Sequence, residues 1–412
     1  ADSIHVVYGH GGDAVRAAFP DPSLSWHAQH EQLGTGHAVA QALPEIPADH
    51  RVLVLCGDVP LIRPQALESL LSSAEDTCLA LLTADLDDPA GYGRIQRGID
   101  GSVVGIVEQA DASDDVLRIT EINTGILTAP AGKLSEWIGK LDRRNAQGEY
   151  YLTDVVEQAV ADGTPVTGVV IDDARDALGI NDRVQLAAAE RALQRRLANE
   201  LLQAGVSLAD PERIDIRGEL SAGRDVFIDI NAILIGRVTL GEGVRVGPNV
   251  LIRDSTIGDG TAIHANSVID GAEIGASCEI GPFARLRPET KLAARVKIGN
   301  FVETKKSDIG TGSKVNHLSY VGDTTIGIDV NVGAGTITCN YDGANKHRTT
   351  IGNDVFIGSS VNLVAPVTIG DGASIGARAP GAKDAPAGQL TVARTRQTSI
   401  PHWKRPQKKP AK

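Results

Sequence analysis

The second half of this chain repeats itself every six residues. Large aliphatic residues recur at this spacing from Ile228 to Ile375, with one long break, and a glycine commonly follows them. Neither the 3.6-residue period of a helix nor the two-residue alternation of a strand gives this spacing, whereas hexapeptide β-helix repeats do. We therefore expect Ile228–Ala377 to form a three-sided column with about 18 residues to a coil and the aliphatic side chains inside. The glycines would supply permissive backbone geometry near its corners.

Length and composition limit the number of domains and the kinds of partner that this chain can have. At 412 residues the chain exceeds the usual size of one domain, so two domains are expected. A formal charge of −12 argues against nucleic acid as the main partner. The four cysteines show no CxxC spacing, so they indicate neither a disulfide framework nor a zinc site. No apolar run reaches transmembrane length and no signal peptide opens the chain, which favours the cytoplasm.

The beginning of the chain is unusual. It contains no methionine and starts just before the apolar stretch Ile4–Tyr8. We therefore expect that its N-terminal segment is missing.

Residues 1–180 alternate strand-like and helix-like segments, a pattern typical of a doubly wound, Rossmann-like α/β domain. The apolar run Arg51–Cys56 predicts a central parallel strand. Gly57 and Asp58 follow it, so a carboxylate would lie at the carboxyl end of a strand, where open α/β sheets bind ligands.

Several turns of this domain carry polar residues or glycine. Gly34-Thr35-Gly36 predicts a turn into a helix, where free N–H groups suit a phosphate, although an ordinary strand-to-helix turn is the simpler interpretation of this motif alone. Gly91–Arg94 and Glu121–Gly125 could be turn chemistry alone. Asn145–Asp154 leads into a helix and is interpreted as structural packing.

A strongly helical stretch, 181–205, predicts a linker helix that Asn181 or Asp182 caps and Gly205 ends. The β-helix domain then occupies 206–412. Its period fails beyond Ala377, because Gly381 stands where an aliphatic residue is expected. The last residues, 394–412, form a basic tail.

The clearest break in the repeat is Thr338–Thr350, which must project as a loop. Insertions into a solenoid point to function, because neighbour stacking gives little reason for them. Near this loop, Arg287 and Lys305 are one expected coil apart and would stack as a clamp for a phosphate monoester. His317 is a candidate base, although a solvated outer face is the simpler interpretation of any one of these residues.

The candidate residues of both domains lie in or near a few specific segments: QLGTGHA, GDVPLI, GYGRI, EINTG, NAQGEYYLTD, GPFARLRP, GNFVE and VGAGTITCNYDGANK. Together they closely resemble the bacterial bifunctional N-acetylglucosamine-1-phosphate uridyltransferase / glucosamine-1-phosphate N-acetyltransferase family, over essentially the whole chain. The resemblance implies a nucleotidyltransferase domain, a linker helix and a left-handed parallel β-helix that forms a homotrimer. It also implies that the product, UDP-N-acetylglucosamine, feeds peptidoglycan and lipopolysaccharide synthesis.

The resemblance implies an acetyl-transfer site on the β-helix, shared between subunits. His317 would take a proton from the 2-ammonium group of glucosamine-1-phosphate so that the free amine attacks the thioester of acetyl-CoA, a role typically worth ~10²–10⁴ in rate. The residues implied to hold the sugar phosphate are Arg287, Lys305, Tyr320, Asn331 and Asn340. Those implied to line the acetyl-CoA site are Ala334, Asn340, Tyr341, Ser359, Ala377 and Arg394.

The resemblance also implies uridylyl transfer from UTP to N-acetylglucosamine-1-phosphate in the first domain. The residues implied to bind the nucleotide and its sugar are Gln29, Gly34, Thr35, Gly57, Asp58, Gly93, Glu108, Asn123 and Asn181. Asp58 and Asn181 would hold Mg²⁺, which neutralises phosphate charge. No segment of this chain matches the family's first strand and its Gly-rich triphosphate loop, so we expect this second activity to be weakened.

Two alternatives remain at this stage. A different sugar nucleotidyltransferase with a structural β-helix would not need the group formed by His317, Tyr320 and Asn340. A trimeric scaffold without activity would need neither the stacked cations nor a repeat-breaking loop.

Overall fold

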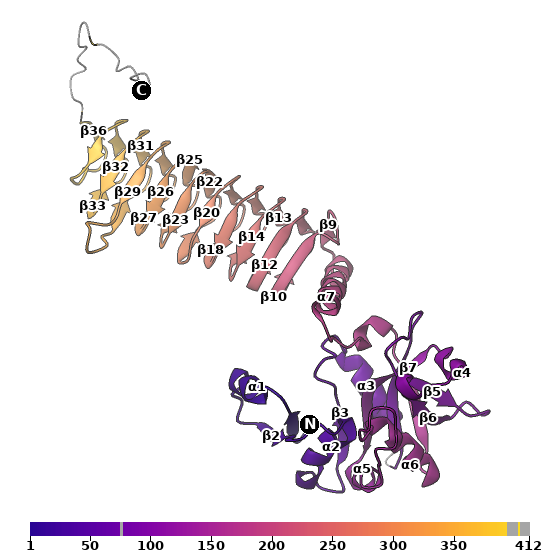
Figure 1. Ribbon diagram of the computed structural model, residues 1–412. Coiled ribbons are helices and arrows are strands. Elements are labelled where there is room, and N and C mark those ends of the chain that lie inside the picture. The colour runs from indigo at the N-terminus through magenta and orange to yellow at the C-terminus, as the bar shows by residue number, and fades with distance from the viewer. Residues whose placement is uncertain (75–76, 394–402, 404–412) are drawn as a thin grey trace, which may run out of the picture. The chain divides into compact units, whose positions relative to one another are not determined.

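The computed structural model describes residues 1–74, 77–393 and 403, and the chain divides into two units, Ala1–Ala192 and Leu193–Lys412. Figure 1 shows the first unit as a layered α/β domain and the second as a stack of short strands. Among the described residues, no helix combines the length and the apolar character that crossing a membrane requires.

The first unit is a three-layer α/β domain. Its main sheet has the strand order β6-β5-β7-β4-β8, and β3 pairs with β7 at its side. The strands of the unit are β1 Ile4–Tyr8, β2 Leu24–Ala28, β3 Arg51–Val54, β4 Leu79–Asp85, β5 Arg94–Arg97, β6 Val103–Val107, β7 Glu121–Pro130 and β8 Val166–Val170. The helices are α1 Gly12–Ala18, α2 Thr35–Ala42, α3 Pro64–Ser73, α4 Asp114–Leu117, α5 Ala131–Ile138 and α6 Val155–Ala161, with single turns η1 Leu43–Glu45, η2 Gln109–Asp111, η3 Leu152–Asp154 and η4 Ala174–Ala177.

The two faces of β4 build the two cores of this unit. Leu79 and Leu81 belong to the cluster that contains Trp137 of α5. Leu82 belongs to the cluster that contains Leu70 of α3. Because successive side chains of a strand point to opposite faces, one strand thus packs against helices on both sides.

The prediction of a central parallel strand at Arg51–Cys56 is wrong. β3 runs antiparallel to β7, and all four of its residues are only partly buried. The central, almost fully buried strand is β4, whereas β1 and β2 form a separate parallel pair. An apolar run indicates burial, but it does not give the direction or the order of a strand in its sheet.

The second unit is the left-handed parallel β-helix that the six-residue period predicts. Ile214 pairs with Ala232 and Leu251 with Val268, so a coil has 18 or 17 residues. The repeated aliphatic side chains form one continuous buried core from Ile228 to Ile375. One face is an 11-stranded parallel sheet: β9 Ser207–Leu208, β11 Phe227–Ile228, β13 Arg245–Val246, β16 Ala262–Ile263, β19 Glu279–Ile280, β22 Lys297–Asn300, β25 Lys314–His317, β28 Asn331–Val332, β31 Phe356–Ile357, β34 Ser374–Ile375 and β36 Leu390–Thr391.

The other two faces join into a 17-stranded sheet in the described part of the chain. Its strands are β10 Ile214–Ala222, β12 Ala232–Leu240, β14 Leu251–Arg253, β15 Thr256–Ile257, β17 Val268–Asp270, β18 Ala272–Ile274, β20 Arg285–Leu286, β21 Thr290–Leu292, β23 Glu303–Lys305, β24 Asp308–Ile309, β26 Tyr320–Gly322, β27 Thr324–Ile326, β29 Ile337–Cys339, β30 Thr349–Ile351, β32 Asn362–Val364, β33 Val367–Ile369 and β35 Pro380–Gly381.

The repeated glycines serve a different purpose from the one we expected. A Cβ atom on Gly258 would lie 2.7 Å from the backbone nitrogen of Ala276, and one on Gly299 would lie 2.0 Å from the carbonyl oxygen of Asn316. Glycine is therefore needed after the aliphatic residue because the next coil passes too close for a side chain. Much of the left-handed corner geometry is supplied by other residues, such as Asn249 at φ 57°.

The column also continues past Ala377, where its sequence period fails. β35 pairs with β32, so that Gly381 lies opposite Leu363. A Cβ on Gly381 would come within 2.7 Å of a Leu363 methyl carbon, so the side chain of the previous coil already fills the expected aliphatic position. The final coil closes with the buried residue Ala385 and with β36.

Helix α7, Arg183–Gln203, covers the open end of this column. Leu197 and Leu201 pack against the aliphatic core and Ala198 is fully buried. The side-chain amide of Gln194 donates to the carbonyl oxygen of Ile216 at 2.8 Å and accepts from its N–H at 2.7 Å. A side chain thus pairs with the edge of β10, which would otherwise offer unpaired backbone groups. The helix is therefore part of the β-helix core and not only a linker between the two units.

Candidate functional sites

The predicted nucleotide turn in the first unit is held against the segment Asn145–Asp154. Gly36 N–H donates to the Tyr150 carbonyl at 2.9 Å, and Leu152 N–H donates to the Thr35 hydroxyl at 3.0 Å. Gly34 adopts φ 108°, and a Cβ there would lie 2.6 Å from the Tyr150 oxygen. Gln29 completes the turn, since its side-chain nitrogen donates to the Gly34 carbonyl at 3.1 Å. The segment that the sequence analysis interpreted as packing is therefore what shapes this turn.

The three residues predicted to contact the sugar lie together: Gly93 directly precedes β5, Glu108 directly follows β6, and Asn123 is in the first part of β7. Asn123 N–H donates to the Gly93 carbonyl at 2.9 Å. A Cβ on Gly93 would come 3.3 Å from a Glu108 carboxylate oxygen, so glycine keeps this carboxylate accessible. Thr153 donates its hydroxyl proton to Glu108 at 3.0 Å. Thr153 belongs to the segment that also holds the nucleotide turn, so one stretch of chain supports both groups.

The predicted metal ligands Asp58 and Asn181 are neighbours through the backbone. Ile180 N–H donates to the Asp58 carbonyl at 2.9 Å, which brings Asn181 beside the exposed Asp58. The carboxylate of Asp58 lies 3.6 Å from where a Gly179 Cβ would stand. Space around Gly57 is open, because a Cβ there would meet no atom within 4 Å. A carboxylate and an amide oxygen are ligands that suit Mg²⁺, so these residues fit such an ion.

A chain of contacts links the metal pair with the sugar group. Gly179 N–H lies 3.4 Å from the Tyr92 hydroxyl, and Tyr92 directly precedes Gly93. The predicted residues of the first unit therefore surround one region of its surface.

Two carboxyl groups in this region hold protons more tightly than usual. Burial is the main cause that raises the pKa of Glu108, with a smaller contribution from the charge of Asp111. Burial, followed by repulsion from Glu157 and Glu108, raises the pKa of Asp154 to about 6. Perturbed carboxyl groups of this kind cluster at functional sites. Asp154 was not among the predicted residues, because its only signal in the sequence is its place at the end of NAQGEYYLTD.

On the β-helix, the predicted cation pair is stacked as expected. Arg287 N–H donates to the Thr304 carbonyl at 2.9 Å, which continues the β20–β23 register and sets Arg287 opposite Lys305. However, the guanidinium group of Arg287 already forms an ion pair of 2.8 Å with Glu303, a residue that the sequence analysis did not single out. A guanidinium group has five N–H donors, so others remain for an anion.

The loop Thr338–Thr350 brings a third cation to this edge of the column. Hydrogen bonding to Lys305 and repulsion from it lower the pKa of Lys346. Asn340, at the start of the loop, donates to the Asp323 carboxylate at 2.5 Å and lies 3.5 Å from the Tyr320 hydroxyl. The edge therefore combines clustered positive charge with polar groups, as a phosphorylated sugar requires.

His317 lies at the neighbouring corner, at the end of β25. Its Nδ1 atom is 2.7 Å from the side-chain oxygen of Asn300, in the preceding coil. Since that oxygen can only accept, Nδ1 carries the proton and the exposed Nε2 atom is left with a free lone pair. Asn300 was not predicted from the sequence. It contacts His317 because the two residues are paired on adjacent coils, 17 residues apart in the chain.

The cations and the imidazole do not meet within one chain. β25 ends at His317 and β26 begins at Tyr320, whereas Lys305 closes β23 at the far end of the same face. β23 and β26 have three residues each, so these strands span roughly 10 Å between the two ends of the face. Asn331 stands at the start of β28, opposite Lys314, away from both groups.

Three of the residues predicted to line the acetyl-CoA site lie along the same corner of the column as His317, on the coils after it. Gly335 N–H donates to the His317 carbonyl, Ser360 N–H to that of Ala334, and Arg378 N–H to that of Ser359. Ala334, Ser359 and Ala377 therefore recur along one corner over successive coils. Tyr341 lies exposed in the loop, and Arg394 lies outside the described residues.

Comparisons with known proteins agree with this two-part architecture. Residues 1–110 match the MobA-like NTP transferase domain, 216–302 the GMPPB C-terminal domain, and 348–379 the bacterial transferase hexapeptide (six repeats). The chain is 57% identical over 409 residues to the bifunctional protein GlmU of Alkalilimnicola ehrlichii, covering 99% of this chain and 88% of that protein. It is 56% identical to the bifunctional protein GlmU of Marinobacter nauticus, covering 99% and 90%. These matches do not establish the expected absence of an N-terminal segment.

Proposed function

The chain belongs to the GlmU family of bifunctional proteins, and from this premise we propose that its two units catalyse two steps toward UDP-N-acetylglucosamine. The β-helix transfers an acetyl group from acetyl-CoA to glucosamine-1-phosphate. The α/β unit transfers a uridylyl group from UTP to N-acetylglucosamine-1-phosphate. The observation that carries the proposal is the pairing of His317, whose Nε2 atom is free to accept a proton, with the cations of Lys305 and Lys346 at the other end of the adjoining strand.

For acetyl transfer, His317 acts as the general base. Its Nδ1–H bond to Asn300 fixes the ring and leaves Nε2 to take a proton from the 2-ammonium group of the sugar. The free amine then attacks the thioester carbon of acetyl-CoA, and the CoA thiolate leaves with the electron pair of the broken carbon–sulfur bond. The proton that the nitrogen loses as the amide forms balances the thiolate, which departs as the CoA thiol. Lys305, Lys346 and Arg287 hold the phosphate, while Tyr320, Asn331 and Asn340 orient the amino sugar.

The acetyl-CoA site lies along the same corner of the column. We assign it to Ala334, Tyr341, Ser359 and Ala377, with Asn340 shared between the two substrates. Arg394 would reach the CoA phosphates.

For uridylyl transfer, the turn formed by Gln29, Gly34 and Thr35 binds the nucleotide. Gly93, Glu108 and Asn123 bind the sugar, and Gly57 leaves open space beside the metal pair. Asp58 and Asn181 would hold Mg²⁺, which when bound neutralises phosphate charge. The residues of this chain orient the phosphate of the sugar for attack on the α-phosphate of UTP, and pyrophosphate leaves.

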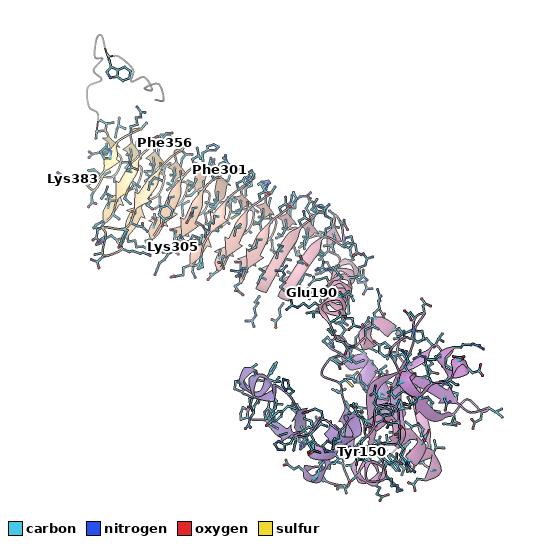
Figure 2. The ribbon with its side chains drawn as sticks, viewed as in Figure 1. Tyr150, Glu190, Phe301, Lys305, Phe356 and Lys383 are labelled. Carbon is cyan, nitrogen blue, oxygen red and sulfur yellow. The ribbon has the colours of Figure 1, made fainter. Side chains whose placement is uncertain are left out.

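We further propose that the protein is a cytoplasmic homotrimer whose acetyl-transfer sites are shared between subunits. Within one chain the cations and His317 lie at opposite ends of a strand, so a neighbouring column would complete the surroundings of the substrate. An exposed apolar strip beside His317 supports this assembly. Phe283 and Phe301 stack with ring centroids 5.3 Å apart, and Leu318 follows on the next coil. Figure 2 shows the side chains of Phe301 and Lys305 at the outer surface of the column.

Replacing His317 with alanine tests the assignment of the base. We expect acetyl transfer to fall by about 10²-fold or more, because the amine would lose its proton acceptor. His264→Ala is the matched control, since it removes another exposed imidazole from the same sheet, after β16. Equal acetylation rates in the two variants would remove His317 from this role.

A further inference from the structure

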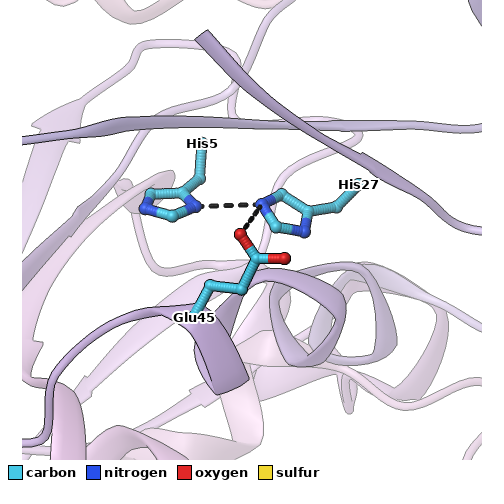
Figure 3. A group of neighbouring side chains, drawn as sticks. All are labelled: His5, His27 and Glu45. Atoms are coloured by element: carbon cyan, nitrogen blue, oxygen red, sulfur yellow. Dashed lines mark hydrogen bonds and ion pairs between the residues drawn. The ribbon is translucent and has the colours of Figure 1, made fainter. Parts of the chain in front are cut away.

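Two histidines and a glutamate meet on the small β1–β2 sheet, and neither proposed activity uses them. His5 lies on β1, His27 on β2 and Glu45 in the turn η1. Figure 3 shows the two imidazole rings facing each other and the Glu45 carboxylate directed toward His27. One ligand atom from each residue lies within 4.8 Å of the others, and among the described residues this is the one such group of three.

The spacing of these atoms is close to that of a metal site. His5 Nδ1 is 2.9 Å from His27 Nε2, which is 3.9 Å from Glu45 Oε2. Around a tetrahedral ion bound at about 2.0–2.1 Å, neighbouring ligand atoms stand about 3.4 Å apart. The two contacts of His27 each differ from this spacing by about half an ångström, and the His5 and Glu45 ligand atoms lie within 4.8 Å of each other.

A further contact already prepares one ring for this role. The second nitrogen of His5, Nε2, lies 3.0 Å from the Ser3 hydroxyl. When Nε2 keeps its proton and donates it there, the lone pair of Nδ1 points at the centre of the group. Histidines that bind metals are usually held in this way through their other nitrogen. His27 would carry its proton on Nδ1 in the loaded form.

The group is also accessible to ions. His27 is 8% exposed, whereas the Glu45 side chain is 63% exposed. The buried His27 imidazole is held in place by its surroundings. The exposed Glu45 carboxylate leaves room for a water molecule as a fourth ligand.

From this geometry we propose that His5, His27 and Glu45 bind one divalent transition-metal ion, Zn²⁺ being the representative ligand. Two imidazoles and one carboxylate suit Zn²⁺, whereas Mg²⁺ prefers oxygen ligands alone. The cysteine spacing gave no indication of this site because none of its ligands is a cysteine. A bound ion would tie β1, β2 and η1 together and so stabilise the first unit.

Isothermal titration of the chelator-treated 412-residue chain with ZnCl₂, in excess Mg²⁺ to occupy oxygen-rich sites, tests the proposal. We expect one Zn²⁺ ion per chain and a rise in the melting temperature of the first unit. His27→Gln and Glu45→Gln should each weaken this binding by about tenfold or more. The exposed Glu45 variant keeps the test valid should His27→Gln disturb folding. His10→Gln, an exposed imidazole after β1, should bind like the parent.

Two results would overturn the proposal. One is the absence of stoichiometric Zn²⁺ binding by the parent chain. The other is binding that His27→Gln, Glu45→Gln and His10→Gln leave equally strong, since the ion would then be bound elsewhere.

Discussion

At the scale of single residues, Asp154 shows how the surroundings of a carboxyl group can oppose folding. Its half-buried side chain lies near four other carboxylates, and its pKa rises to about 6 from an ordinary value of 3.8. The folded protein therefore binds more protons than the unfolded chain between these two values. Its stability falls as the pH rises through this window, and above about pH 6 the full penalty is present.

We predict that Asp154→Asn stabilises the first unit at neutral pH. The gain should be about 1 kcal/mol once solvent screening of this partly exposed group is allowed for. Thermal unfolding at about pH 7 should show a higher midpoint for the variant, and the difference should disappear near pH 4. The exposed Asp87→Asn serves as the control. A gain that is the same at both pH values would contradict this explanation.

At the scale of elements, the β-helix must protect the edge of its first coil. Strand β10 begins the 17-stranded sheet, and the Gln194 amide forms hydrogen bonds with both backbone groups of Ile216. Because Gln194 is buried, loss of its amide would leave an N–H and a C=O group without their partner.

We predict that Gln194→Leu destabilises the β-helix by about 1–3 kcal/mol. Leucine keeps most of the volume of the side chain but cannot bond to the strand edge. Chemical denaturation followed by far-ultraviolet circular dichroism measures the effect, with the exposed Gln203→Leu as the control on the same helix. If both variants have the same denaturation midpoint as the parent, the stability of this strand edge does not depend on the Gln194 amide.

The elements also show what the sequence could predict. The six-residue period predicted the column, and the spacing of Arg287 and Lys305 predicted their stacking, because both follow from a fixed coil length. The partners Glu303 and Asn300 escaped prediction, since they depend on side-chain direction within that register. The antiparallel direction of β3 also escaped, because an apolar run is compatible with either direction.

At the scale of the whole molecule, we propose that a neighbouring chain completes the acetyl-transfer site. Large apolar side chains stand exposed beside His317: Phe283 is 49% exposed, Phe301 56% and Leu318 60%. Exposed apolar patches of this kind mark contact surfaces. We therefore expect the columns to associate through this strip.

Accordingly, Phe301→Asp should dissociate the assembly, because a charge would be buried in the contact. Light scattering should show a smaller mass, with acetyl transfer lost and uridylyl transfer retained. Phe19→Asp, an equally exposed phenylalanine in the first unit, should leave the mass unchanged. A trimer that survives Phe301→Asp would exclude this strip as the interface.

The most direct test of the central claim is to measure both activities in two variants, His317→Ala and Asp58→Asn. Because the two proposed sites lie in separate units, each variant should lose one activity by about 10²-fold or more and keep the other near the parental rate. His317→Ala should lose only acetyl transfer, and Asp58→Asn should lose only uridylyl transfer. Loss of both activities in either variant, or of neither, would contradict the account.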